Sequence, residues 1–337
     1  MKTFWLVLLA ATSSFADDLP TFAKWEDDHQ FDCNCPYEKT QPDVKKYQGW
    51  TYEQSGATVK VRRDGKRKGG PVLGVLAGIK DLEPETQATL KRFLDAFEKE
   101  DVDVILIGGD AAEEPEVLDK IYGWLTEATG RPLLAVLGNT ERAGAHNYAI
   151  AKLRKAGKLN LLNADVARRT DFDGFDVVSA GGYYDKKYLH LSGGCIYTQT
   201  SLDEVVSAAK DSDDVVVYLG HGPPKQTGKN AIDYANVNLN VGDPQLNEVI
   251  TKGAIPFGVF GHILEAGARA TDLKGNPVPQ KKMLKSFYFN PGSANPLPWK
   301  LNDGTTSYGL AGLIRVQAKQ ASYEVLRAPK PPPQPVE

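Results

Sequence analysis

Four apolar runs, each followed by glycine and then by a polar residue, constrain the fold of this chain more than any other feature. The runs are 104–107, 133–137, 215–219 and 257–260. The polar residues that follow their glycines are Asp110, Asn139, His221 and His262. Between the runs lie segments with apolar residues at helical spacing, of which 84–99 is the clearest. Alternating strands and amphipathic helices predict an α/β fold whose first half contains a parallel sheet.

The same patterns predict the other elements. We expect strands also at 72–77, 176–180, 286–289, 310–316 and 322–326, and the strand before Asp110 to begin at residue 102. We expect further helices at 116–128, 145–155, 202–210 and 244–252. The chain has 337 residues, 41% hydrophobic and 25% charged, which excludes collagen-like, coiled-coil and wholly disordered classes. Its 40 basic and 43 acidic residues nearly balance, so no global field favours nucleic acid or an anionic membrane.

Composition divides the chain into four parts. Residues 1–16 have the pattern of a signal peptide, with Lys2, an apolar run at 4–11 and a small-x-small site at 14–16; an N-terminal core strand is the alternative. Residues 17–70 form a polar extension that ends in a basic stretch, expected to be a solvated loop or hairpin, or a polyanion-binding patch. Residues 71–328 form the α/β domain, and 329–337 a proline-rich tail. No apolar run is long enough to span a membrane, so we expect an exported protein, periplasmic or secreted.

The three cysteines allow at most one disulfide. They are Cys33, Cys35 and Cys195, and the spacing of the first two is too short for a zinc knuckle. A bond from Cys33 or Cys35 to Cys195 would tie the N-terminal segment to the domain.

The four strand-end residues predict a shared polar site. Ligands bind beyond the carboxyl ends of the strands in open α/β sheets, so Asp110, Asn139, His221 and His262 are expected to converge there. A carboxylate, an amide and two imidazoles suit a borderline divalent metal such as Zn, Mn or Fe. Each motif alone is weak, because Gly-Asp is commonly a turn and a lone His is commonly structural.

The order of these motifs resembles that of the calcineurin-like metallophosphoesterases. The family pattern is Asp-x-His, Gly-Asp, Gly-Asn-His-Glu or Gly-Asn-His-Asp, a strand-end His, and Gly-His-x-His. The resemblance covers about residues 71–327, and Asn-Pro-Gly-Ser at 290–293 is similar to a turn of the smaller phosphodiesterase-like members. It implies the four-layer α/β/β/α sandwich of the metallophosphoesterase type.

Three positions depart from the family pattern. Gly78-Ile79-Lys80 stands where the family has Asp-x-His, Thr140 replaces the His that assists the leaving group, and Leu264 replaces the last His. The absent residues are the three non-bridging ligands of one metal, whereas Asp110, Asn139, His221 and His262 match the ligands of the other. The resemblance therefore implies one divalent metal ion, Mn, Zn or Fe, at a reduced site.

Seven further residues are candidates for the site. The ammonium of Lys80 either supplies positive charge in place of the lost cation or points to solvent. Lys225 either reaches a phosphate or lies on the surface. Glu141 and Arg142, beside Asn139, either contact substrate or cap the following helix. Tyr183, Tyr184 and Trp299 either stack on a substrate or pack in the protein.

Two functions follow from these residues. The first is an exported phosphoesterase that hydrolyses a small phosphomonoester or phosphodiester with a single metal. The second is a non-catalytic descendant of the fold that binds a ligand or a partner protein. The four intact ligands favour the first, and Thr140 and the lost Asp-x-His favour the second.

Overall fold

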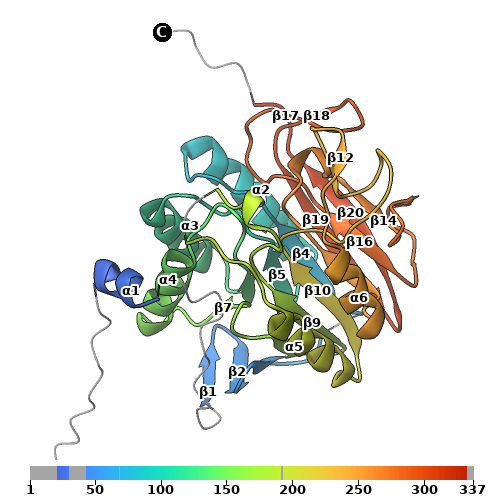
Figure 1. Cartoon of the computed structure of the whole chain (residues 1–337). Coiled ribbons are helices and arrows are strands. Elements are labelled where there is room, and N and C mark those ends of the chain that lie inside the picture. Colours follow the sequence, from blue (N-terminus) through green and yellow to red (C-terminus); the bar gives the residue numbers. More distant parts are fainter. Residues whose placement is uncertain (1–20, 30–42, 68, 191–192, 332–337) are drawn as a thin grey trace, which may run out of the picture.

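Two β-sheets lie face to face, and helices cover the outer face of each (Figure 1). The structure is a computed structural model that describes residues 21–29, 43–67, 69–190 and 193–331. One sheet has six strands in the order β20 (Gln320–Arg327), β19 (Leu310–Gln317), β4 (Val72–Leu76), β5 (Val104–Ile107), β6 (Leu133–Ala135) and β7 (Leu161–Asn163). Strands β4 to β7 are parallel, as expected for the first half of the domain.

The second sheet has ten strands and carries the other half of the site. Its order is β1 (Asp43–Tyr47), β2 (Trp50–Ser55), β3 (Thr58–Arg63), β8 (Arg169–Phe172), β9 (Phe175–Ala180), β10 (Val215–Gly220), β13 (Phe257–Val259), β16 (Phe287–Asn290), β14 (Arg269–Thr271) and β15 (Pro277–Val278). Strands β9, β10, β13 and β16 are parallel neighbours. Two small hairpins complete the strands, namely β11 (Tyr234–Ala235) with β12 (Leu239–Asn240), and β17 (Trp299–Lys300) with β18 (Thr306–Ser307).

The helices and the core confirm the four-layer α/β/β/α sandwich. The helices are α1 (Phe22–His29), α2 (Pro84–Lys99), α3 (Pro115–Ala128), α4 (Ala143–Lys155), α5 (Gln199–Lys210) and α6 (Pro244–Lys252), with 3₁₀ turns η1 (Lys186–Tyr188) and η2 (Leu264–Ala266). Alternate residues of the buried strands point to opposite faces. In β4, Leu73 and Val75 pack between the sheets, while Leu76 packs with α2, α3 and α4. Helices α5 and α6 cover the outer face of the larger sheet.

The N-terminal extension corrects one expectation. We expected a solvated loop or hairpin up to residue 70. The structure has antiparallel β1–β2 and β2–β3 pairs there, but they are not merely solvated, because β3 pairs in parallel with β8 and makes β1–β3 part of the larger sheet. Trp50, Tyr52, Val59 and Val61 are buried in the core between the sheets. Charged residues on the other face mask this alternation in the sequence. Cys33 and Cys35 lie outside the described residues, so a bond to the buried Cys195 stays a prediction.

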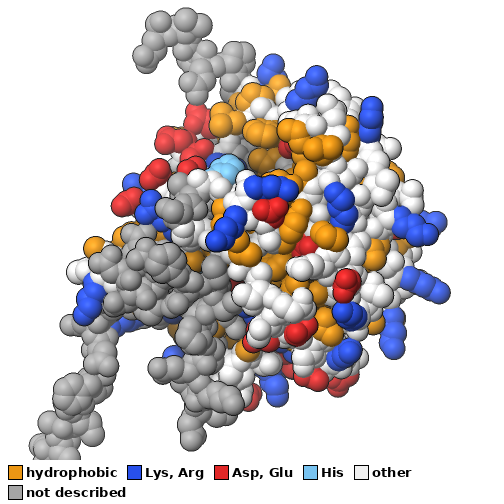
Figure 2. All heavy atoms as spheres, viewed as in Figure 1, with side chains coloured by type: hydrophobic (Ala, Val, Ile, Leu, Met, Phe, Trp, Pro, Cys, Tyr) orange, Lys and Arg blue, Asp and Glu red, His pale blue; other side chains and the backbone are white. Residues whose placement is uncertain are grey.

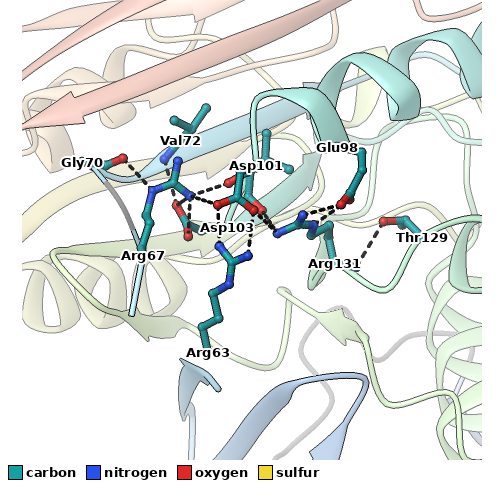
Figure 3. Close-up of polar contacts among 10 residues, drawn as sticks. Arg63, Arg67, Gly70, Val72, Glu98, Asp101, Asp103, Thr129 and Arg131 are labelled. Atoms are coloured by element: carbon teal, nitrogen blue, oxygen red, sulfur yellow. Dashed lines mark hydrogen bonds and ion pairs between the residues drawn. The ribbon is translucent and has the colours of Figure 1, made fainter. Parts of the chain in front are cut away.

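The arginines of the basic stretch are held by ion pairs within the fold, whereas Lys60 and Lys66 are exposed. Arg63 and Arg131 both bind the carboxylate of Asp101, and Arg67 binds that of Asp103 (Figure 3). Arg131 also makes two hydrogen bonds to Glu98 at the end of α2. The arginines thus join the β2–β3 hairpin to the amino end of β5, at the opposite end of that strand from Asp110. This arrangement argues against a polyanion-binding patch built from these arginines.

Candidate active site

The loops after β5, β6, β10 and β13 bring Asp110, Asn139, His221 and His262 together. The Nε2 of His221 lies 2.7 Å from Asn139 Oδ1, 3.3 Å from Asp110 Oδ1 and 3.2 Å from His262 Nδ1. His262 Nδ1 is also 2.8 Å from Asn139 Oδ1. The convergence follows from the topology, because the carboxyl ends of parallel strands meet at one edge of each sheet.

Glycine is needed where the loop after β5 turns. Gly109 has φ +83°, and Asp110 itself has φ +54°, so both adopt the left-handed conformation. A Cβ at Gly109 would lie 2.6 Å from His221 Nδ1 and 2.7 Å from Gly138 Cα. Only glycine therefore lets the strand ends approach closely enough for the four side chains to meet.

Most of the converging atoms are hydrogen-bond acceptors that present a lone pair. His221 Nδ1 lies 2.8 Å from the carbonyl of Gly108, so that nitrogen carries the proton and Nε2 presents its lone pair. The amide nitrogen of Asn139 donates to the carbonyl of Tyr188 at 2.6 Å, which directs Oδ1 toward the histidines. The 2.7 Å approach of His221 Nε2 to Asn139 Oδ1 thus joins two acceptors, and a cation or a shared proton is needed between them.

Burial and charge shift the pKa values of these groups. Burial would raise the pKa of Asp110, but His221 and Lys80 outweigh it and hold that pKa well below its usual value. Burial lowers the pKa of His221, and burial together with His221 lowers the pKa of His262 to about 3. At neutral pH both imidazoles are neutral, which is the form that ligates metals.

Lys80 faces the site. Its Nζ is 2.8 Å from Asp110 Oδ2, and its side chain is 34% exposed while that of Asp110 is 5% exposed. Of the two orientations left open by the sequence, the structure has the one directed into the site, at the carboxylate of Asp110, rather than the one directed to solvent. The loop that carries Lys80 is held from the far end of the chain, because Ser293 donates to the carbonyl of Gly78 and Asn295 to that of Ile79, each at 2.7 Å.

Glu141 lies beneath the site and is fully buried. One of its oxygens accepts the backbone N–H of Ala111, and the other accepts that of Gly138 at 3.0 Å. It therefore links the Asp110 loop to the Asn139 loop. Burial, followed by the charge of Asp110, raises the pKa of Glu141 to about 7. These contacts favour a positioning role over the substrate contact considered from the sequence.

The remaining candidates lie around this centre. The hydroxyl of Thr140 donates to Asp110 Oδ1 at 3.1 Å, so it is committed to that carboxylate. Arg142 is half-buried at the start of α4. Lys225 is exposed and donates to the carbonyl of Asn240. The structure brings neither Arg142 nor Lys225 into the group formed by the four strand-end residues.

Tyrosine side chains pack beside His262, and the sequence predicted only some of them as candidates. Tyr183 is fully buried, with its ring centroid 4.4 Å from that of His262, so it packs against the site instead of offering a free stacking surface. Tyr188 lies 5.0 Å from Tyr183. The exposed His190 follows it, and its N–H donates to the carbonyl of Asn139. The sequence signal for this loop was the Tyr-Tyr pair alone.

Comparison with known proteins identifies the family. The sequence profile of the calcineurin-like phosphoesterases matches residues 81–266, just over half of the chain, and the chain belongs to this family. The match begins directly after Lys80 and includes all four strand-end residues. A search among curated proteins finds no match.

Two solved structures, with TM-scores above 0.5, support the fold. One crystal structure aligns with a TM-score of 0.56, at 13% identity over 77% of this chain and 99% of the other. The protein TT1561 of Thermus thermophilus aligns with a TM-score of 0.51 at the same identity and coverage. A dimetal phosphatase from Danio rerio aligns with a TM-score of 0.46, at 10% identity over 77% of this chain and 99% of the other. At such identities the likeness concerns the fold alone.

The family implies a divalent metal, which the donor set fits in its chemistry. As placed, the side chains contact one another directly, and no group of three or more His, Cys, Asp or Glu among the described residues is spaced to hold an ion. One carboxylate, one amide oxygen and two neutral imidazoles nevertheless form the donor set that borderline divalent ions prefer. Among the described residues, no helix is both long enough and apolar enough to cross a membrane.

Proposed function

We propose that this chain is a phosphoesterase that hydrolyses small phosphomonoesters or phosphodiesters with one divalent metal, Mn, Zn or Fe. The observation that carries the proposal is the convergence of Asp110, Asn139, His221 and His262, in which two acceptors, Asn139 Oδ1 and His221 Nε2, lie 2.7 Å apart. These four residues would hold the ion. When bound, it would polarise a phosphoryl oxygen and lower the pKa of water.

The chain's own residues would bind and orient the phosphate. The ammonium of Lys80, which lies beside Asp110, would neutralise phosphoryl oxygens in place of the second metal of the family. Glu141 holds the Asp110 and Asn139 loops in register, and the buried ring of Tyr183 excludes water from the His262 side.

The leaving group receives little help from this site. Thr140 stands where the family has a histidine, and its hydroxyl is hydrogen bonded to Asp110. A threonine hydroxyl is a poor proton donor at neutral pH. Substrates whose alcohol leaves readily as an anion should therefore be preferred.

A second function, a non-catalytic ligand- or protein-binding role, is favoured by one observation. The Lys80–Asp110 ion pair satisfies the carboxylate that bridges two metals elsewhere in the family. In this alternative the ion pair stabilises the loops, and the site recognises an anionic ligand without cleaving it.

A metal-loading assay with a matched pair of variants separates the two functions. Protein stripped with chelator is reloaded with Mn, Zn or Fe and assayed on p-nitrophenyl phosphate and bis-p-nitrophenyl phosphate. Asp110→Asn should abolish turnover and metal retention. Asp119→Asn, which removes an α3 carboxylate paired with Lys152, should retain both. Phosphate binding without turnover under every loading would favour the second function.

We propose further that the protein is exported to the periplasm or secreted. The support is the pattern of residues 1–16, which lie outside the described residues. Expression of the full chain in a secreting host, followed by N-terminal sequencing, should give a mature protein that begins at Asp17. A retained Met1 on protein recovered outside the cytoplasm would contradict cleavage at this site.

A further inference from the structure

A pocket of about 400 Å³ lies beside the Lys80 loop and outside the strand-end centre. Its walls come from three parts of the chain that are distant in sequence. They include Asp81, Glu83, Asn295, Leu297, Tyr308 and Lys330. Asn295 Nδ2 lies 2.7 Å from both the carbonyl of Ile79 and Asp81 Oδ2, so the pocket wall flanks the residue that contacts Asp110.

The pocket combines an aromatic surface with negative charge. Asp81, Glu83 and Glu85 lie at the amino end of α2, and Tyr308 and Leu297 supply apolar surface opposite them. Figure 2 shows acidic side chains gathered at the edge of an apolar area on this face. An aromatic ring with nearby carboxylates attracts organic cations, since the ring face and the carboxylates both favour positive charge.

The chain already places a cation of its own in this pocket. The Nζ of Lys330 lies over the ring of Tyr308, 5.9 Å from its centroid. Lys330 is exposed and belongs to the last described segment of the chain. This contact shows that the pocket accepts a positively charged group. Because Lys330 is exposed, a ligand can displace its ammonium.

We propose that this pocket binds the organic cation of a phosphoester substrate, an ester of an amino or quaternary ammonium alcohol. The inference rests on the proposed function, because Lys80 and the metal ligands would hold the phosphate while the cation occupies the neighbouring pocket. Attraction to the carboxylates and to Tyr308 selects the charged alcohol over a neutral alcohol of the same shape.

Binding of the free cation tests the pocket without any turnover. Choline chloride and its neutral isostere 3,3-dimethylbutan-1-ol are titrated into the full chain by calorimetry at constant ionic strength. Choline should bind more tightly, by about fivefold or more. Glu83→Gln should weaken choline binding about two- to fivefold. Glu114→Gln is the matched control and should leave choline binding unchanged, because Glu114 lies outside the pocket. Like Glu83 before α2, Glu114 directly precedes the first-turn proline of its helix, α3, and its side chain does not cap that helix.

Two more variants sharpen the test. Tyr308→Leu should weaken choline binding, and Lys330→Ala should strengthen it because the competing ammonium is removed. The opposite sign of the Lys330 effect separates displacement from general damage to the fold. Equal binding of choline and the isostere, or equal effects of Glu83→Gln and Glu114→Gln, would overturn the proposal.

Turnover then separates the pocket from the proposed function. p-Nitrophenyl phosphorylcholine is compared with the ester of the neutral isostere, and KM should favour the cationic ester in the wild type but much less in Glu83→Gln. Choline binding without hydrolysis of either ester would support the pocket and contradict the hydrolase. Equal KM values for both esters, unchanged by Glu83→Gln, would overturn the pocket's role while the hydrolase stands.

Discussion

Replacing Lys80 by methionine should change metal and phosphate affinity in opposite directions. The substitution keeps the length of the side chain and removes the ammonium that lies 2.8 Å from Asp110 Oδ2. Without the ammonium, no cationic side chain competes with a divalent ion for the negative charge of Asp110. An anion, in contrast, loses a cationic side chain that faces the site. Lysine and methionine both carry a Cβ, so the left-handed backbone at φ +74° is equally strained in the two proteins.

The magnitude follows from the exposure of the pair. At 2.8 Å and an effective dielectric constant of about 20, the gross attraction is about 6 kcal/mol. Desolvation of Asp110 opposes it, and Lys80 is about one third exposed, so the net value is about 1–2 kcal/mol. Metal affinity should therefore rise about 5- to 30-fold, and phosphate affinity should fall by a similar factor.

Calorimetric titrations of Mn²⁺ and of inorganic phosphate into chelator-treated protein measure both effects. Lys225→Met is the matched control, because Lys225 also follows a strand-end motif but is exposed and bonded to the carbonyl of Asn240. Its two affinities should equal those of the wild type. Unchanged or weaker Mn²⁺ binding in Lys80→Met would refute the claim that the ammonium competes with a cation for Asp110.

Three further predictions concern the surroundings of the site. Glu141→Gln should lower the free energy of unfolding by about 1–3 kcal/mol and weaken metal binding, because the new NH₂ group would face one of the two backbone N–H groups that now donate to the carboxylate. Denaturant unfolding measures the change in stability, and a variant as stable as the wild type would contradict the proposed link between the two loops. The rate for p-nitrophenyl phosphate should exceed that for an alkyl phosphate by about 10²-fold or more, and Thr140→His should narrow the gap; a wild type that cleaves both equally has another proton donor. Hydrogen bonds from Arg63, joined by those from Arg131, lower the pKa of Asp101 from 3.8 to about 2, so the ion-pair contribution is present above pH 4 and lost as pH falls toward 2. Asp101→Asn should remove that part of the acid unfolding curve, and an identical curve would show that the pair adds nothing.

The main elements and the convergence of the four strand-end residues could be predicted because they depend on local patterns and topology. The predicted helices at 84–99 and 244–252 coincide with α2 and α6, where a first-turn proline marks the start of each. Polar residues directly after buried parallel strands have only one edge of the sheet to occupy, so Asp110, Asn139, His221 and His262 meet there.

The features that could not be predicted depend on partners distant in the chain. Glu141 accepts a hydrogen bond from Ala111, 30 residues earlier, and Asn295 holds the Lys80 loop from 216 residues away. The strands β2 and β3 were not predicted because their buried residues alternate with polar and charged ones, such as Lys60 and Arg62 in β3. Strand β1 has no buried residue at all. The partner of Arg62 is Asp171, 109 residues away. Local periodicity carries no information on such pairs.

The number of metal ions bound per chain tests the central claim most directly. The full chain is purified without chelator and equilibrated with Mn²⁺, and the metal is quantified by inductively coupled plasma mass spectrometry. The account predicts one divalent ion per chain, lost in Asp110→Asn and retained in Asp119→Asn. Two ions per chain, or none at saturating metal, would contradict a site in which four strand-end ligands hold a single cation and Lys80 takes the place of the other.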